Sequence, residues 1–172
     1  SFASKGKAQI MKHTKDVINT SSLVAETYAY GLVDKQAIEV SVNGVKTEIN
    51  PIGYGYRYLW PSISPNAEKL VFNEVYSGLF VSNLDGSQAK FLTSRGEFPC
   101  WVDDKFVVAL STKDDGYVIT SAKIIAIEVA TGKITELTDD SVLVDGLAAV
   151  EDKIVYTTEK GEMYVMNILI NE

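Results

Sequence analysis

Cysteine and histidine are nearly absent from this chain, whose 172 residues contain one of each, Cys100 and His13. A single cysteine excludes an intrachain disulfide bond. Because Cys100 lies in the apolar segment 98–102, we expect its thiol to be buried as a small hydrophobic group. One histidine leaves little material for a catalytic triad or a zinc site. His13 follows Lys12 near the end of a predicted strand, so we expect a solvated surface side chain and no catalytic residue.

The chain also lacks an excess of basic residues and a long apolar run. Its net charge is −7 and its pI about 4.8, which argues against nucleic acid or an anionic membrane as partner. No apolar run approaches the roughly 20 residues of a membrane helix, so we expect no membrane insertion. A phosphate-binding glycine loop, a nucleophile elbow and a dinucleotide motif are all missing from the sequence. We therefore expect no cofactor and no metal, while protein and glycan partners stay open.

What the chain does contain is a unit of four predicted strands between Trp60 and Thr93. A short strand begins at Trp60 and ends at a turn near Pro65, and further apolar strands follow at residues 70–72, 79–82 and 89–92. The third and fourth strands are separated by Asp85-Gly86. Asp-Gly between two alternating runs favours a type I′ hairpin, because glycine adopts positive φ without strain.

This unit recurs along the chain. Gly6, Gly44, Gly86 and Gly132 each precede a short alternating strand and lie 38, 42 and 46 residues apart. Four strands in each repeat of about 40 to 45 residues are typical of a β-propeller blade. Apolar second-strand segments recur at residues 23–25, 70–72, 106–108 and 154–156, and third-strand segments at 37–40, 79–82, 124–127 and 163–166.

The repeats predict an all-β fold, a β-propeller of about four four-stranded antiparallel blades in a single domain, residues 1–172. The last unit has no fourth strand, whereas the chain begins with an isolated one at residues 8–12. We expect this N-terminal strand to close the ring and leave a monomer. The alternative is a fragment of a larger propeller whose open ring self-associates, for example as a dimer of half-rings. We place the blades at about residues 17–51, 58–93, 97–138 and 144–170, the last together with residues 8–12.

The second unit resembles the TolB-like propeller repeat, also called the WD40-like or PD40 repeat. The third unit keeps an aromatic residue before Pro99, but its second hairpin is longer, over residues 112–122. The resemblance implies a propeller fold and a periplasmic or extracellular location, but no single function. The matching residues are Pro61, Ser64-Pro65, Lys69-Leu70-Val71-Phe72, Asp85-Gly86 and Leu92-Thr93, while Asn66-Ala67 stands where the family has Asp-Gly.

The most distinctive local stretch is the tyrosine-rich link that precedes the second unit. Links between an outer strand and the next inner strand commonly carry ligand-contacting loops in propellers. Tyrosine, tryptophan and arginine are enriched at binding hot spots, and aromatic faces also stack on sugars. Packing between neighbouring blades is the alternative role. The predicted binding residues are Tyr54, Tyr56, Arg57, Tyr58 and Trp60.

Paired aspartates are the remaining candidates for chemistry. Such pairs can act as acid and base or bind Ca²⁺. Because they fall in predicted turns, and because no calcium-loop spacing is present, we expect them to be turn residues instead. The residues concerned are Asp103-Asp104, Asp114-Asp115, Asp139-Asp140 and Asp145.

Together these patterns predict a non-catalytic binding or scaffold module that contacts a protein partner. The alternative is an accessory, substrate-gating propeller of a larger peptidase or glycan-active enzyme, which predicts an attached catalytic domain. A glycan-binding module would need aromatic–acid pockets on each blade, and the other units lack an equivalent of the tyrosine cluster.

Overall fold

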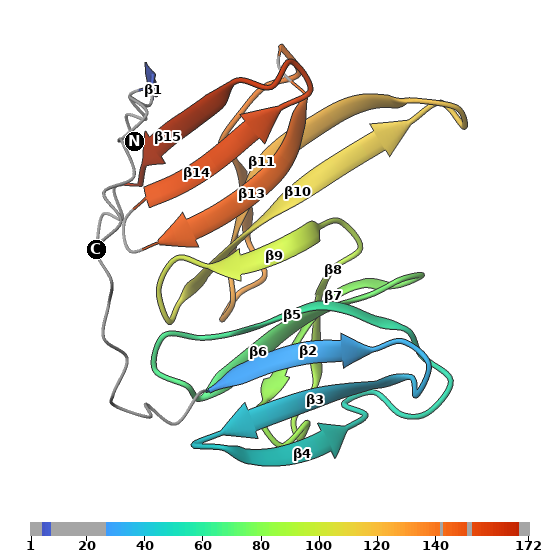
Figure 1. Cartoon of the computed structure of the whole chain (residues 1–172). Coiled ribbons are helices and arrows are strands. Elements are labelled where there is room, and N and C mark those ends of the chain that lie inside the picture. The colour runs from blue at the N-terminus through green and yellow to red at the C-terminus, as the bar shows by residue number, and fades with distance from the viewer. Residues whose placement is uncertain (1–4, 8–26, 142, 151–152, 169–172) are drawn as a thin grey trace, which may run out of the picture.

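The computed structural model describes residues 5–7, 27–141, 143–150 and 153–168, and every regular element in these ranges is a β-strand. The strands form four antiparallel sheets along an arc, from β2–β4 at the bottom of Figure 1 to β13–β15 at the top. The all-β propeller prediction is confirmed. No helix long and apolar enough to cross a membrane occurs in these described ranges.

The first two sheets contain seven strands. The first sheet has β2 (Tyr28–Leu32), β3 (Ala37–Val42) and β4 (Val45–Ile49), and the second has β5 (Tyr58–Ile63), β6 (Lys69–Glu74), β7 (Gly78–Asn83) and β8 (Lys90–Thr93).

The other two sheets contain eight strands. The third sheet has β9 (Glu97–Trp101), β10 (Phe106–Asp114), β11 (Ile119–Glu128) and β12 (Ile134–Glu136), and the fourth has β13 (Val144–Val150), β14 (Lys153–Thr158), β15 (Met163–Asn167) and β1 (Lys5–Lys7).

The core lies between consecutive sheets. In β6, Leu70 and Phe72 pack toward the first sheet, and Val71 packs toward the third. This strand is therefore buried on both faces, which explains its continuous apolar run. Between the third and fourth sheets, Val108 and Leu110 pack against Ile154. Stacking face to face thus buries the alternate residues of each strand in a different layer.

The fourth sheet is completed from the N-terminal end of the chain. Lys5–Lys7 pairs antiparallel with β15, with Gly6 opposite Val165. The predicted N-terminal strand, residues 8–12, lies outside the described residues, as do His13 and the predicted strand segment 23–25. The strand that pairs with β3 is Tyr28–Leu32. Closure of the ring stays a prediction.

One end of the sheets collects the connections of interest. Because the strands are antiparallel, the turn from the second to the third strand lies at the same end as the link to the next sheet. We call this end the link face. Figure 1 shows the β10–β11 hairpin projecting from it, at the right. The connections on the link face are residues 33–36, 50–57, 75–77, 94–96, 115–118, 137–143 and 159–162.

Candidate binding face

The tyrosine-rich link is anchored by Tyr58, the first residue of β5. Its side chain is 1% exposed and its ring packs edge-on against Phe72, with centroids 5.5 Å apart. The hydroxyl donates a hydrogen bond to the Gly53 carbonyl oxygen at 2.7 Å and accepts one from the Ile52 amide at 3.3 Å. Burial raises the pKa of this phenol. Tyr58 therefore fixes the link to the core rather than facing solvent.

The other aromatic residues of the link face solvent. Tyr54 is 86% exposed, and Tyr56 and Arg57 are exposed as well. The Arg57 guanidinium forms no ion pair within the described ranges. The five predicted residues thus divide into one anchor, three exposed side chains and Trp60, which lies in a groove.

Glu74 connects this link with the adjacent β6–β7 turn. Its carboxylate is on a residue only 1% exposed and accepts hydrogen bonds from the amides of Ser77 at 2.9 Å and Tyr76 at 3.2 Å. A longer contact, 3.5 Å, joins it to the Arg57 amide, and the Val75 amide binds the Arg57 carbonyl oxygen at 3.2 Å. A buried carboxylate is tolerated here because backbone donors surround it. It orders two neighbouring connections of the link face.

Trp60 and Phe98 occupy corresponding irregularities in the first strands of the second and third sheets. Each precedes a proline, and each has positive φ, 48° for Trp60 and 50° for Phe98. The pairing register shifts beside both residues, between Leu59 and Ser62 and opposite the start of β9. Such bulges re-aim side chains at barrel rims and functional sites. Here they bring the two rings together, with centroids 4.2 Å apart.

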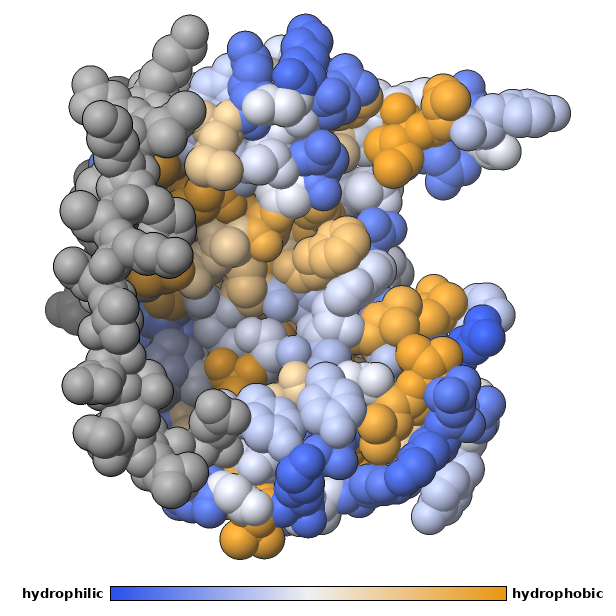
Figure 2. All heavy atoms as spheres, in the orientation of Figure 1, coloured by the Kyte–Doolittle hydropathy of each residue, from blue (hydrophilic) through white to orange (hydrophobic). Residues whose placement is uncertain are grey.

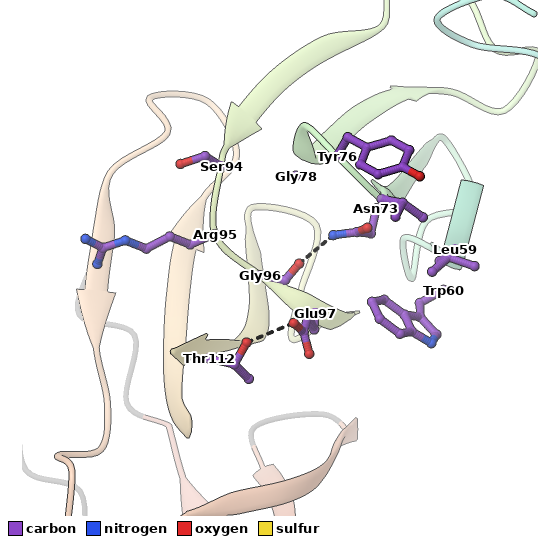
Figure 3. Close-up of a pocket in the computed structure, with 11 residues that line it drawn as sticks. Leu59, Trp60, Asn73, Tyr76, Gly78, Ser94, Arg95, Gly96, Glu97 and Thr112 are labelled. Atoms are coloured by element: carbon purple, nitrogen blue, oxygen red, sulfur yellow. Dashed lines mark hydrogen bonds between the residues drawn. The ribbon is translucent and has the colours of Figure 1, made fainter. Parts of the chain in front are cut away.

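Trp60 lines a groove of about 350 Å³ between the second and third sheets, which we call the aromatic groove. Figure 3 shows Trp60 and Tyr76 on one side of it, and Arg95 on the other with its side chain directed away from Trp60. Figure 2 shows the molecule indented at the right, between the projecting hairpin and the lower sheets. The lining residues are Leu59, Trp60, Asn73, Val75, Tyr76, Gly78, Ser94, Arg95, Gly96, Glu97 and Thr112.

Two hydrogen bonds fix the floor of the aromatic groove (Figure 3). The Asn73 amide nitrogen donates to the Gly96 carbonyl oxygen at 2.7 Å, and the Thr112 hydroxyl donates to the Glu97 carboxylate at 2.8 Å. Gly96 has a φ of 123°, and a Cβ there would collide with the side chain of Leu79. The link 94–96 can therefore lie directly on β7 only because residue 96 is glycine.

A second groove, of about 390 Å³, lies between the third and fourth sheets, and we call it the hairpin groove. It shares Glu97 and Thr112 with the aromatic groove. Its walls come from the projecting hairpin, β9 and the connections 137–143 and 159–162. The lining residues are Glu97, Phe98, Leu110, Thr112, Val118, Ile119, Ala122, Leu143, Val144, Asp145 and Glu159.

The aspartates expected in turns are dispersed over the structure, and for two of them the expectation is wrong: Asp114 is the last residue of β10 and Asp145 lies in β13. The Asp103 carboxylate accepts from the amides of Lys105 and Phe106, and that of Asp115 from the amides of Tyr117 and Val118. The backbone bonds to Asp115 lower its pKa. Within the described ranges no group of acidic, histidine or cysteine side chains is arranged to hold a metal ion.

Sequence reasoning missed Tyr76, Phe98 and the apolar tip of the β10–β11 hairpin. A signal for Phe98 was present, because Phe98-Pro99 repeats the aromatic–proline pair of Trp60-Pro61. Tyr76 carries no such signal, since the turn that exposes it is fixed by the carboxylate of Glu74. The hairpin tip was predicted only as an extension, without its exposed side chains.

No family model and no curated protein sequence matches this chain significantly. Among solved structures, the putative TolB of Agrobacterium tumefaciens superposes with a TM-score of 0.56 at 15% identity, covering 71% of this chain and 45% of that one. TolB of Acinetobacter baumannii gives 0.55 at 19% identity, covering 83% and 41%. The computationally designed Ika4 protein gives 0.55 at 16% identity, covering 82% and 84%.

The chain thus spans less than half the length of either TolB structure and most of the designed protein. At these levels of identity, structural likeness concerns the backbone arrangement and not the chemistry of a site. The four stacked antiparallel sheets and these superpositions establish that the chain has a TolB-like β-propeller fold.

Proposed function

We propose that this chain is a non-catalytic propeller module that binds a protein partner through its link face. The contact residues are Tyr54, Tyr56, Arg57 and Trp60, with Tyr58 as the anchor of the link. The observation that carries the proposal is the paired positive φ of Trp60 and Phe98, which brings two large aromatic rings into contact where the two grooves adjoin, with Trp60 lining the aromatic groove and Phe98 lining the hairpin groove.

The positive φ of Trp60 and Phe98 costs conformational free energy. A bulky residue in the left-handed region costs on the order of 1–3 kcal/mol, and such strain gathers at binding and active sites. If Trp60 and Phe98 only packed between blades, the ordinary strand conformation with negative φ, as in other inner-strand residues, would suffice. Strain at equivalent positions of two consecutive sheets therefore favours a recognition role for the two adjoining grooves that these residues line.

The composition of the link face fits a protein partner. Both arginines of the chain, Arg57 and Arg95, lie in connections of this face, although the protein as a whole carries a charge of −7. Tyrosine, tryptophan and arginine dominate binding energy in protein interfaces. A glycan is a weaker fit, because the exposed tyrosines of the link face do not recur evenly. Tyr54, Tyr56 and Tyr76 lie beside the second sheet and Tyr117 at the hairpin tip of the third, whereas no described tyrosine of the fourth sheet is exposed.

We further propose a periplasmic or extracellular location, based on the resemblance of the second unit to TolB-like repeats. We assign no catalytic residue, cofactor or metal. Neither the location nor the absence of catalytic chemistry depends on the binding face. Cell fractionation tests the location, and hydrolase and metal-content assays test the absence of catalytic chemistry.

Site-specific photo-crosslinking in cells that produce the protein tests the proposed face. A photoreactive amino acid replaces Tyr54 on the link face or Val45, which is 70% exposed at the start of β4, next to the β3–β4 turn at the opposite end. We expect a discrete crosslinked species from position 54 and none from position 45, and its loss in a background with Trp60→Ala. Equal products from both positions, or none from position 54, contradict the proposal.

A further inference from the structure

The hairpin groove combines exposed apolar side chains with a strand that continues beyond its neighbour. Val118 and Ile119 at the hairpin tip are 61% and 54% exposed, and Phe98 at the base of the groove is 40% exposed. These side chains line one continuous hollow with the buried Leu110. Exposed apolar groups gathered in a hollow mark interaction sites more often than scattered ones do.

The edge of β10 beside this groove lacks a strand partner over its last residues. β9 pairs with β10 only as far as Glu97, which lies opposite Leu110. Residues 111–114 therefore have no strand on that side within the described ranges. The chain before Glu97 turns away, because the Gly96 carbonyl oxygen binds Asn73 in the second sheet. An edge with free backbone donors and acceptors can receive an extended chain.

The same edge separates the two grooves. Thr112 lines both of them, and the faces of the third sheet pack in opposite directions, Ala109 toward the second sheet and Leu110 toward the fourth. A strand added here would alternate its side chains between the aromatic groove and the hairpin groove.

The charges of the hairpin groove are of one sign. Glu97, Asp145 and Glu159 line it, and no lysine or arginine does. The first two accept hydrogen bonds from neutral hydroxyls, Thr112 at 2.8 Å and Thr157 at 2.5 Å. No described residue forms an ion pair with Glu159, whose side chain is exposed. A cationic side chain would complement this rim.

We propose that an extended segment of the partner protein adds to residues 111–114 of β10 in line with β9, with an apolar residue and a lysine or arginine in the hairpin groove. This inference rests on the proposed function, because it describes the partner that the link face would bind. In this arrangement the backbone of β10 forms hydrogen bonds with the added segment. The carboxylates of Glu97, Asp145 and Glu159 favour a basic side chain in that segment.

Selection of a random peptide library displayed on phage, with the intact chain immobilised, tests this inference. We expect enriched peptides to alternate apolar with polar residues and to contain lysine or arginine. Their binding should weaken at least about tenfold in Glu159→Lys and in Ile119→Asp, and stay unchanged in Glu68→Lys, an equal charge change at an exposed residue of the β5–β6 turn at the opposite end. Circular dichroism and thermal melting establish that the variants are folded.

Backbone recognition is tested separately with the best peptide. Two versions of this peptide are made, one methylated at the amide nitrogens of its odd-numbered residues and one at those of its even-numbered residues. One version should lose binding and the other keep it, because only one edge of the added strand bonds to β10. Equal binding of the two methylated peptides overturns the inference, as does the absence of enriched peptides. Peptides that depend on Trp60 but ignore Glu159 and Ile119 support the proposed function while overturning this deeper assignment.

Discussion

Trp60 and Phe98 pack ring on ring with centroids 4.2 Å apart, each from a backbone with positive φ and each followed by a proline. The contact joins the first strands of consecutive sheets, next to the hydrogen bond from the Trp101 indole to the Ser62 carbonyl oxygen at 2.9 Å. Two local irregularities thus support each other across a sheet boundary. The position is both a packing contact and a wall of the aromatic groove.

A double-mutant cycle should detect the energetic coupling of these rings. We expect Trp60→Ala and Phe98→Ala to be non-additive by about 0.5–1.5 kcal/mol in the free energy of unfolding, since aromatic pairs contribute that much beyond burial. Urea denaturation provides the measurement. Trp60→Ala with Phe91→Ala is the control, because the Phe91 ring contacts Phe80 instead. Additive effects for Trp60 and Phe98 would show that their proximity carries no stabilisation.

The Tyr58 hydroxyl should be required for an ordered link. Tyr58→Phe removes a hydrogen bond to Gly53 and leaves its carbonyl oxygen without this donor, so we expect a loss of about 0.5–1.5 kcal/mol in unfolding free energy. Hydrogen exchange of the Ile52 amide should accelerate as well. Tyr54→Phe, at an exposed position of the same link, is the control and should leave both readouts unchanged. An unaltered exchange rate in Tyr58→Phe would remove the anchoring role.

The strands and turns of the second sheet could be predicted because pattern and turn chemistry agree there. The alternating runs and Asp85-Gly86 predict the β7–β8 hairpin, and Gly86 does adopt a positive φ of 81°. The predicted type I′ turn is wrong, because Asp85 does not adopt positive φ and the Gly86 amide donates to the Asn83 carbonyl oxygen, which places Leu84 and Asp85 at the centre of the turn. β2 was missed: the second strand of the first unit was expected at residues 23–25, whereas β2 spans Tyr28–Leu32 and includes Gly31. The structure explains that glycine, since a Cβ at residue 31 would lie 2.5 Å from the Tyr58 carbonyl oxygen. A tertiary contact between two sheets dictates this residue, and local sequence carries no sign of it.

The candidate site was only partly accessible to sequence reasoning. The tyrosines of the link were identified as a group, but an irregular segment has no period that separates buried Tyr58 from exposed Tyr54. Likewise, the positive φ of Trp60 breaks the strand alternation that would otherwise assign its face. The grooves depend on how far the β10–β11 hairpin projects past its neighbours. That projection is a property of stacked sheets rather than of any single stretch.

Glycine 78 should tolerate no side chain. A Cβ at Gly78 would collide with the backbone at Thr93 and Ser94, whereas Gly116, also at positive φ, has open space around it. We expect Gly78→Ala to lower the unfolding free energy by at least about 2 kcal/mol and Gly116→Ala by about 1, the second reflecting conformational strain alone. Thermal or urea unfolding of both variants measures the difference. Equal losses of unfolding free energy in the two variants would mean that residues 94–96 move away from position 78 without an energetic cost.

Removal of residues 1–7 should expose the edge of β15. Lys5–Lys7 is the strand paired there, and a free edge of this kind recruits other chains. We expect the shortened protein to self-associate at concentrations where the full chain is a monomer, as measured by light scattering coupled to size exclusion. A full chain that already self-associates to the same extent would favour the open ring and contradict a protective role for β1.

Cys100 should react slowly with thiol reagents at neutral pH. Burial raises the pKa of its thiol to about 11, and only the thiolate is nucleophilic. The rate of alkylation by iodoacetamide should therefore keep rising between pH 8 and pH 10 in the folded protein, whereas an unfolded thiol levels off above about pH 9. The raised pKa of this thiol also makes the unfolding free energy depend on pH. The folded state retains a proton that the unfolded state releases above about pH 8.5, so stability should fall as the pH rises beyond that value. Cys100→Ser, whose hydroxyl does not titrate in this range, should lose that part of the pH dependence. An alkylation rate that levels off above about pH 9 in the folded protein would show that the thiol is accessible and that the contact of β9 with the fourth sheet opens readily.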